Sequence, residues 1–224
     1  MTVSGKSTHS GTTTVKAGEL CLKAGAQLGT GTLTVAKDAM LSGVTSTTVP
    51  LTNSSVTLQS GATLRVGASA TATSGLMSFG GKNLTIPRGA TLQLAVARNA
   101  TATATGGTSI QKIGKLTMNG TIQLTIPESH TLAVGDSVLL WKDVTSFSGS
   151  PELASYYISS GLFWDDSDIA RGILRVTDVA PVGISDLVNS KADDTWYDLS
   201  GRPVQTPRRG QTYIFRGRRV KVAK

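Results

Sequence analysis

Carboxylates gather at one place in the chain, in the run Trp-Asp-Asp-Ser-Asp at 164–168. Carboxylate oxygens are the ligands that Ca²⁺ prefers, so Asp165, Asp166 and Asp168 form a candidate calcium site. The run lacks the further oxygen ligands and the glycine of a calcium-binding loop. A solvated turn is therefore the interpretation that we favour.

Acidic residues are too sparse elsewhere for carbohydrate cleavage. β-Helical enzymes that cut polysaccharides need paired carboxylates, or a base beside Ca²⁺ ligands, on one face. Over residues 1–135 the only acidic residues are Glu19, Asp38 and Glu128, which lie far apart in the sequence. We therefore expect a protein that is not an enzyme, with no catalytic residue and no cofactor.

The remaining reactive side chains lack partners for catalysis. His9 and His130 have no cysteine or carboxylate at the spacing of a triad or a metal site. Ser137, in Gly-Asp-Ser-Val-Leu, does not lie in a nucleophile elbow. Cys21 is the single cysteine and permits no internal disulfide, so we expect it to face inward as a small hydrophobic residue.

The charge of the protein is concentrated at its C-terminal end. The net charge is +8, and eight of the 22 Lys and Arg residues follow residue 200, so the first 200 residues carry 14 basic and 14 acidic side chains. Only 16% of the residues are charged, against about 25% on average. This low charge, together with the many small β-tolerant residues, argues against a helical bundle. The basic residues are not interleaved with stacking aromatics, so we expect no nucleic-acid binding.

Residues 13–96 read as short strands separated by glycine-containing turns. Apolar residues alternate with polar ones, which is typical of strands that bury one face. A turn phrase recurs as Lys-Ala-Gly-Ala-Gln-Leu at 23–28, Gln-Ser-Gly-Ala-Thr-Leu at 59–64 and Pro-Arg-Gly-Ala-Thr-Leu at 87–92, with a variant at 118–124. This pattern predicts an all-β fold, a β-solenoid over 1–119, in the form of a right-handed parallel β-helix. Residues 72–83 and 97–114 break the rhythm, and we expect loops there.

After Gly120 the aromatic residues cluster. A solenoid must cover its last coil, so we interpret 120–180 as a closing segment in which Trp141, Phe163 and Trp164 cap the core. Residues 181–194 are a predicted linker. Residues 195–224 form a predicted basic antiparallel β module, too short to fold without support.

Two resemblances connect these patterns to known families. The stretch Gly-Leu-Phe-Trp-Asp-Asp-Ser at 161–167, followed by Gly172, Leu174 and Val176, resembles the closing phrase of autotransporter-type passenger repeats. The end of the chain resembles the short sorting-type tail of exported Bacteroidota proteins, whose longer relatives direct type IX secretion. The residues that match this tail are Tyr197, Leu199, Gly201, Val204, Pro207, Gly210, Tyr213, Ile214, Gly217, Val220 and Lys224. No autotransporter translocation barrel follows the passenger-like part, which departs from that family's usual pattern.

The tail resemblance implies an exported protein, secreted or held on the outer-membrane cell surface, with export machinery as the partner of the tail. The triplet Asp136-Ser137-Val138 also resembles a Bacteroidota O-glycosylation acceptor. The sequence has no signal peptide at its start, so we expect this numbering to begin inside a longer precursor. No apolar run approaches the length of a membrane span.

We therefore expect a non-catalytic, adhesin-like stalk whose outer faces contact surface or host glycans or proteins. The alternative is the C-terminal fragment of a β-helix polysaccharide lyase or hydrolase whose active turns lie upstream. A glycan-binding module ranks third, because it needs exposed aromatic side chains and the aromatic residues fall where a cap is required.

Overall fold

The computed structural model describes residues 1–45, 50–67, 69, 75–96, 107–127, 131–159, 161–180, 196–198, 202–206, 212–215 and 218–221. The chain divides into two compact units, Met1–Asp178 and Val179–Lys224. Within the described ranges the regular structure consists of strands and one 3₁₀ turn, η1 (Ile169–Arg171), with no α-helix. The protein is all-β.

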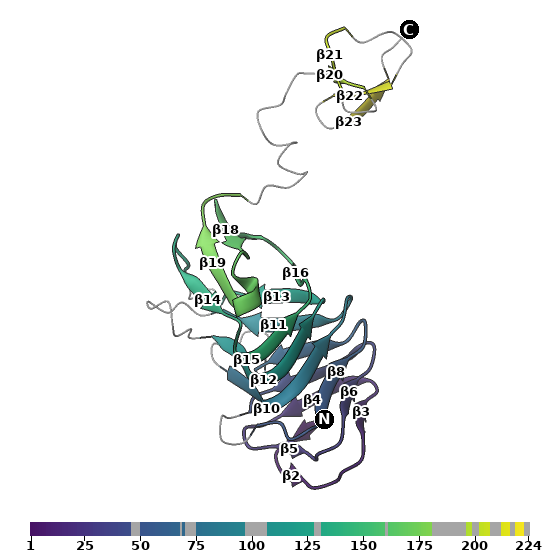
Figure 1. The fold of residues 1–224 in the computed structure, drawn as a ribbon, viewed down its shortest axis with the longest axis vertical. Coiled ribbons are helices and arrows are strands. Elements are labelled where there is room, and N and C mark those ends of the chain that lie inside the picture. The colour runs from purple at the N-terminus through teal and green to yellow at the C-terminus, as the bar shows by residue number, and fades with distance from the viewer. Residues whose placement is uncertain are drawn as a thin grey trace. The chain divides into compact units, whose positions relative to one another are not determined.

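Two parallel sheets make up most of the first unit (Figure 1). The seven-stranded sheet runs in the order β1 (Thr2–Val3), β4 (Gly18–Leu22), β7 (Ala39–Gly43), β9 (Thr63–Val66), β11 (Thr91–Ala95), β13 (Thr121–Thr125), β16 (Glu152–Leu153). The six-stranded sheet runs in the order β3 (Thr13–Val15), β6 (Leu33–Val35), β8 (Ser55–Leu58), β10 (Gly75–Ile86), β12 (Thr108–Met118), β15 (Trp141–Ser148). A short parallel pair joins β2 (Lys6–Ser7) to β5 (Gln27–Leu28).

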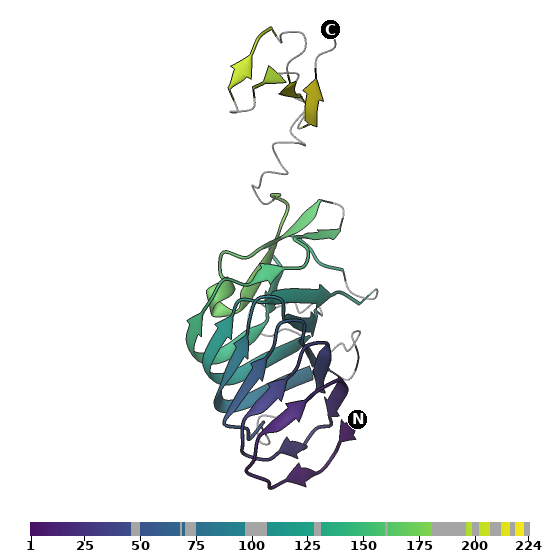
Figure 2. The same ribbon diagram turned by 90° about the vertical axis from the view of Figure 1, so that its right-hand side faces the viewer.

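The chain passes alternately through the two large sheets, and we call each such pass, with its strand in each sheet, a layer. Each new layer adds its strands next to those of the layer before. The strands of both sheets therefore follow one another in chain order, from purple to green (Figure 2). Each strand thus pairs with the equivalent strand of the next layer, and not with the strand that directly follows it in the chain.

The register of these strands stacks equivalent side chains on one another. In the seven-stranded sheet one column of apolar residues runs through six successive strands. Its members, each in register with the next, are Leu20, Leu41, Leu64, Leu92, Ile122 and Leu153. The first five are buried, because alternate side chains of a strand point to the same face and this face lies inside.

One turn, used four times, sets the register. In each copy a residue with positive φ precedes a buried alanine, and the alanine N–H donates to the carbonyl three residues earlier. The phrase repeated in the sequence supplies three copies, with glycine in the left-handed position, where it adopts positive φ at no steric cost. The pairs of residues are Gly25–Ala26, Asp38–Ala39, Gly61–Ala62 and Gly89–Ala90.

The copy at Asp38–Ala39 and the variant at 118–124 both depart from the glycine–alanine pair of the repeated phrase. Asp38 adopts φ 62° where the other copies have glycine, so this turn carries no glycine signal. In the variant, Thr121 pairs with Thr91, which places Gly120 at the position of Ala90. Gly120 thus stands where the other layers have the buried alanine.

The predicted loops at 72–83 and 97–114 are wrong where the structure describes them, because β10 and β12 cover Gly75–Ile86 and Thr108–Met118. Residues 72–74 and 97–106 of these two predictions lie outside the described residues. These two strands pair in parallel over their length, with register shifts between Ser78 and Leu84. Met77, Ser78 and Phe79 are buried consecutively, so the period-two pattern fails there. Positive φ at Gly80 and Gly81 accompanies this irregular pairing.

The expectation that Cys21 faces inward is also wrong. Leu20 and Leu22 are buried, whereas Cys21 between them is only half-buried. Adjacent residues of a strand point to opposite faces, so two inward leucines place the cysteine outside. It lies in register with Ser42 of the next strand.

A four-stranded antiparallel sheet follows the two parallel ones. Its order is β14 (Ser137–Leu139), β19 (Ile173–Thr177), β18 (Leu162–Asp165), β17 (Tyr157–Ser159). In the second unit, β20 (Trp196–Tyr197), β21 (Pro203–Val204), β22 (Thr212–Phe215) and β23 (Arg218–Lys221) form another antiparallel sheet. There Tyr213 is buried and meets Trp196 edge-on, with ring centroids 6.2 Å apart.

Because one face of β9 is buried and the other is not, substitution of two neighbouring residues should lower the free energy of unfolding by different amounts. Leu64→Ala should lower the free energy of unfolding by about 2–5 kcal/mol, because it leaves a cavity in a fully buried column. Thr63→Ala, on the outer face of the same strand, should cost less than about 1 kcal/mol. Urea unfolding followed by circular dichroism measures both, and equal costs would contradict the assignment of faces.

Candidate functional site

The three carboxylates of the acidic run are each held by a different partner. The Asp165 carboxylate accepts a hydrogen bond from the backbone N–H two residues on, at 2.9 Å. Asp166 accepts one from the Tyr156 hydroxyl at 2.7 Å, and Asp168 forms an ion pair with Arg175 at 2.9 Å. In the part of the chain that the structure describes, no three His, Cys, Asp or Glu side chains are grouped to hold a metal ion. This arrangement secures a turn.

Ser137 lies on β14, an edge strand of the antiparallel sheet, and is half-buried. The neighbouring Asp136 carboxylate accepts a hydrogen bond from the Ala133 N–H at 2.8 Å, which closes the turn before this strand. His130 and Glu128 lie outside the described residues.

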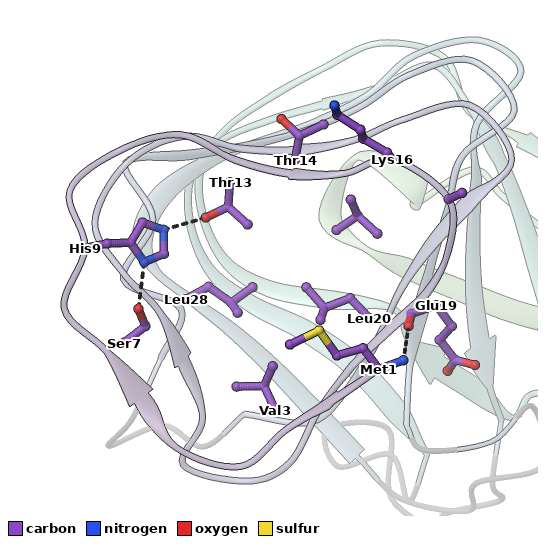
Figure 3. A pocket seen from close by; sticks show the side chains of 12 residues that line it. Met1, Val3, Ser7, His9, Thr13, Thr14, Lys16, Glu19, Leu20 and Leu28 are labelled. Atoms are coloured by element: carbon purple, nitrogen blue, oxygen red, sulfur yellow. Dashed lines mark hydrogen bonds between the residues drawn. The ribbon is translucent and has the colours of Figure 1, made fainter.

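His9 is fixed between two hydroxyls at the first layer (Figure 3). Ser7 Oγ lies 2.6 Å from His9 Nδ1, and Thr13 Oγ1 lies 2.7 Å from His9 Nε2. In a neutral imidazole one ring nitrogen donates and the other accepts, so the two hydroxyls take opposite roles. These contacts hold the corner between β2 and β3.

A cavity of about 480 Å³ opens beside this corner (Figure 3). Apolar side chains form much of its wall. They come from β1, β3, β4 and β5 and from the residue before β1, and they are Met1, Val3, Val15, Leu20 and Leu28. The carboxylate of Glu19 accepts hydrogen bonds from Ser42 and Arg65. The wall thus suits apolar side chains better than a reacting group.

The outer face of the six-stranded sheet carries a row of hydroxyls. Its members lie in register on six successive strands and are Thr14, Thr34, Thr57, Thr85, Thr117 and Ser148. Parallel strands lie about 4.8 Å apart, so hydroxyls repeat at that spacing along the row. We call these six residues the hydroxyl row.

The predicted cap residues do not share one environment. Trp141 and Trp164 are 1% and 3% exposed and belong to the core, and Phe147 stacks on Trp141 with ring centroids 5.6 Å apart. Phe163 is half-buried and meets Tyr157 edge-on at 6.0 Å. Since Phe163 and Trp164 are adjacent in β18, their side chains point to opposite faces.

Gly172 joins the antiparallel sheet to the last layer, a role that the sequence pattern did not reveal. Its φ is 78°, in the left-handed region, and a Cβ there would lie 2.6 Å from the Trp141 indole Cδ1. Its carbonyl accepts a hydrogen bond from the Leu140 N–H at 2.7 Å. A close approach of this kind requires glycine.

A second cavity, of about 380 Å³, lies where the parallel stack meets the antiparallel sheet. Apolar, polar and two aromatic residues line it, and they are Gln123, Leu124, Ile126, Ala154, Ser155, Tyr157, Ile158 and Trp164. We call it the junction cavity. No local sequence pattern predicts this cavity, because its walls come from segments about thirty residues apart that only folding brings together.

Of the predicted tail residues, Tyr197 lies on β20 and Tyr213 on β22. Their strands pair, with Tyr197 opposite Ile214. Leu199, Gly201, Gly210, Gly217 and Lys224 lie outside the described residues.

Removal of a buried indole tests the cap. Trp164→Ala should lower the free energy of unfolding by about 3–5 kcal/mol, because the side chain is almost fully buried. Phe163→Ala, on the other face of the same strand, should cost clearly less. Thermal and urea unfolding measure both variants, and a near-zero change for Trp164→Ala would contradict its place in the core.

The protein should lose stability at high pH because of the Tyr156 hydroxyl. Burial raises the pKa of its hydroxyl from 10.0 to about 12, and the hydrogen bond to Asp166 and the charges of Asp166 and Glu152 add to the shift. The unfolded chain loses this proton first, so the contribution to stability is complete below pH 10.0 and disappears as the pH rises towards about 12. Absorbance of tyrosinate and unfolding at each pH measure the effect. Tyr156→Phe should remove this component, and an unchanged pH profile would contradict the assignment.

Comparisons with protein-family models, with curated proteins and with solved structures found no match for this chain. Across the described ranges, no helix has the length and apolar character needed to cross a membrane.

Proposed function

We propose that this chain is the stalk portion of an exported bacterial cell-surface protein of the autotransporter-passenger-like kind, without catalytic activity. The observation that carries the proposal is the in-register stacking of apolar columns inside and hydroxyls outside over successive layers. In this proposal the two parallel sheets are sides of a β-solenoid, a right-handed parallel β-helix, which the antiparallel sheet closes with Trp141 and Trp164. Such a body is stiff and presents regular outer faces.

The mechanism is passive. The apolar cavity at the first layer, with the unpaired edges of β1 and β3 beside it, has the shape that another coil of the same kind would cover. Further coils stacked there would project a distal region away from the cell. The hydroxyl row offers weak, repeated contacts to surface or host glycans or proteins.

The C-terminal module serves export and anchoring in this proposal. The residues that resemble a sorting-type tail, Tyr197 and Tyr213 among them, would be read by export machinery of the type IX kind. The protein would then be secreted or held at the outer-membrane surface, in a Bacteroidota cell, where Ser137 is a candidate O-glycosylation site.

Surface display in a type IX-competent Bacteroidota host tests the proposal. The full chain, placed behind a signal peptide, should reach the cell surface, where antibody and external protease detect it. The matched control replaces 195–224 by a scrambled segment of the same composition, which keeps all eight basic residues but destroys the pattern. The scrambled chain should remain in the periplasm. Equal export of both chains, or of neither, would refute the tail's role.

A further inference from the structure

The two large sheets differ in the charge that their strands carry. The six-stranded sheet contains four lysines and one aspartate, a net charge of +3. The seven-stranded sheet contains one arginine and two glutamates, a net charge of −1. The lysines all lie on β10, β12 and β15, which are neighbours in their sheet (Figure 1). We call them the lysine cluster, and they are Lys82, Lys112, Lys115 and Lys142.

The register of the three strands brings the four lysines together. Lys82 of β10 pairs with the residue after Lys112 of β12, and Lys142 of β15 pairs with the residue before Lys112. Lys112 therefore lies diagonally between the other two, on strands that are about 4.8 Å apart. Lys115 lies three residues further along β12. All four side chains are exposed, and their flexible stems allow the ammonium groups to meet one extended ligand.

The backbone beneath the lysine cluster is held in place. A Cβ at Gly114 would collide with the Gly81 carbonyl oxygen, so β10 and β12 approach each other here as only glycine allows. Asn83 Oδ1 accepts a hydrogen bond from the Lys115 N–H at 3.0 Å. Lys112 has φ 52°, in the left-handed region that a lysine seldom adopts. The four side chains thus start from fixed positions on a rigid sheet.

The positive charge of the cluster is not neutralised by nearby side chains. Within the part of the chain that the structure describes, none of the four lysines forms an ion pair. Asp143, at the position of Lys112 in the next strand, is the one carboxylate on the six strands of this sheet. Like charges on neighbouring strands destabilise a sheet. A bound polyanion would remove that cost, so the cluster favours an anionic ligand.

The surroundings of the cluster decide between kinds of anionic ligand. Phe79 and Trp141 are buried, and Phe147 stacks on Trp141, so these strands offer no free ring on which a nucleic-acid base could stack. None of the exposed large hydrophobic side chains lies on these strands, so no residue here would insert into a membrane. Thr117 of the hydroxyl row lies two residues after Lys115, on the same face. Ammonium groups beside hydroxyls suit a sugar that carries charge.

We propose that the outer face of the six-stranded sheet binds an acidic polysaccharide, with its carboxylate or sulfate groups on the lysine cluster and its hydroxyls against the hydroxyl row. Lysine is a compact charge without the planar fork of arginine, so this face would recognise charge density along the chain. Since successive strands repeat every ~4.8 Å, an extended polyanion can cross β10, β12 and β15 in turn. The inference rests on the proposed function for the location of the ligand and deepens it by naming acidic glycans as the partner.

Calorimetric titration of the full purified chain with defined oligosaccharides tests the proposal. One acidic probe is a heparin hexasaccharide, which carries sulfate and carboxylate groups, and the other is a hexagalacturonate, which carries carboxylate groups alone. Maltohexaose is the neutral comparison. At least one acidic hexasaccharide should bind, more weakly as the salt concentration rises, because salt screens the contacts between exposed charges. Maltohexaose should not bind.

Two variants that lose the same charge separate the cluster from the basic protein as a whole. The cluster variant combines Lys82→Gln, Lys112→Gln, Lys115→Gln and Lys142→Gln. The control variant changes four exposed lysines of the first layers, and it combines Lys6→Gln, Lys16→Gln, Lys23→Gln and Lys37→Gln. The cluster variant should bind about ten-fold or more weakly, because charge contacts dominate the affinity for a linear polyanion, and the control should stay within about two-fold. Circular dichroism must show the native spectrum for both.

A second readout locates the ligand, because the C-terminal module also carries eight basic residues. Acetylation of the lysine amines with and without the heparin hexasaccharide, followed by mass spectrometry, reports each side chain separately. The lysine cluster should be protected more strongly than the four lysines of the control variant. Binding by the C-terminal module alone would protect only the lysines after residue 200.

The proposal is overturned if neither acidic hexasaccharide binds, if the cluster and control variants bind equally well, or if the cluster stays unprotected. It also fails if maltohexaose binds as tightly as the acidic probes. Stronger protection of the cluster by a thymidylate hexanucleotide, or by vesicles of anionic lipid, would contradict it as well. Failure here is distinguishable from failure of the proposed function, because binding is measured on purified protein and export is measured in cells.

Discussion

The in-register parallel stacking of layers is the constraint on which the rest of this structure depends. Each inward side chain packs on its equivalents above and below, so the position of one layer is set by its two neighbours. Leu64 lies between Leu41 and Leu92 in this way. The turn with positive φ and a buried alanine keeps the layers in phase, because it returns the chain to the same point of the column each time. The outward rows, including the hydroxyl row, follow from the same register.

A stack of this kind has two ends, and in this protein the two ends differ in what covers them. At the last layer the antiparallel sheet takes over, with Gly172 close against Trp141 and Trp164 buried. At the first layer the apolar walls around Val3 and Val15 remain open as a cavity. An unpaired strand edge with an apolar column behind it is a template for further β pairing. In the proposed stalk, further layers would therefore be added at the first end.

The sequence predicted the all-β class and the face of most strands, because alternation and the repeated turn phrase are local signals. It failed where the local signal is broken. Met77, Ser78 and Phe79 are buried in succession at a register irregularity, so β10 resembles a loop in the sequence. Asp38 forms the repeated turn without its glycine. Cys21 faces outward because the alternation set by the buried Leu20 and Leu22 outweighs its own hydrophobic character.

The junction cavity could not be predicted from the sequence, for a different reason. A repetitive stack offers the same surface in every layer, so its regular rows can give repeated contact but little selectivity. Selectivity requires a place where repetition ends. The junction cavity is such a place, because β13 outruns its short partner β16 and the chain then turns into the antiparallel sheet. Gln123 repeats Gln93 of the layer before and accepts a hydrogen bond from its amide, so the outer row continues up to β13. The repetition thus ends where β13 loses its covering strand, and the junction cavity opens at that point.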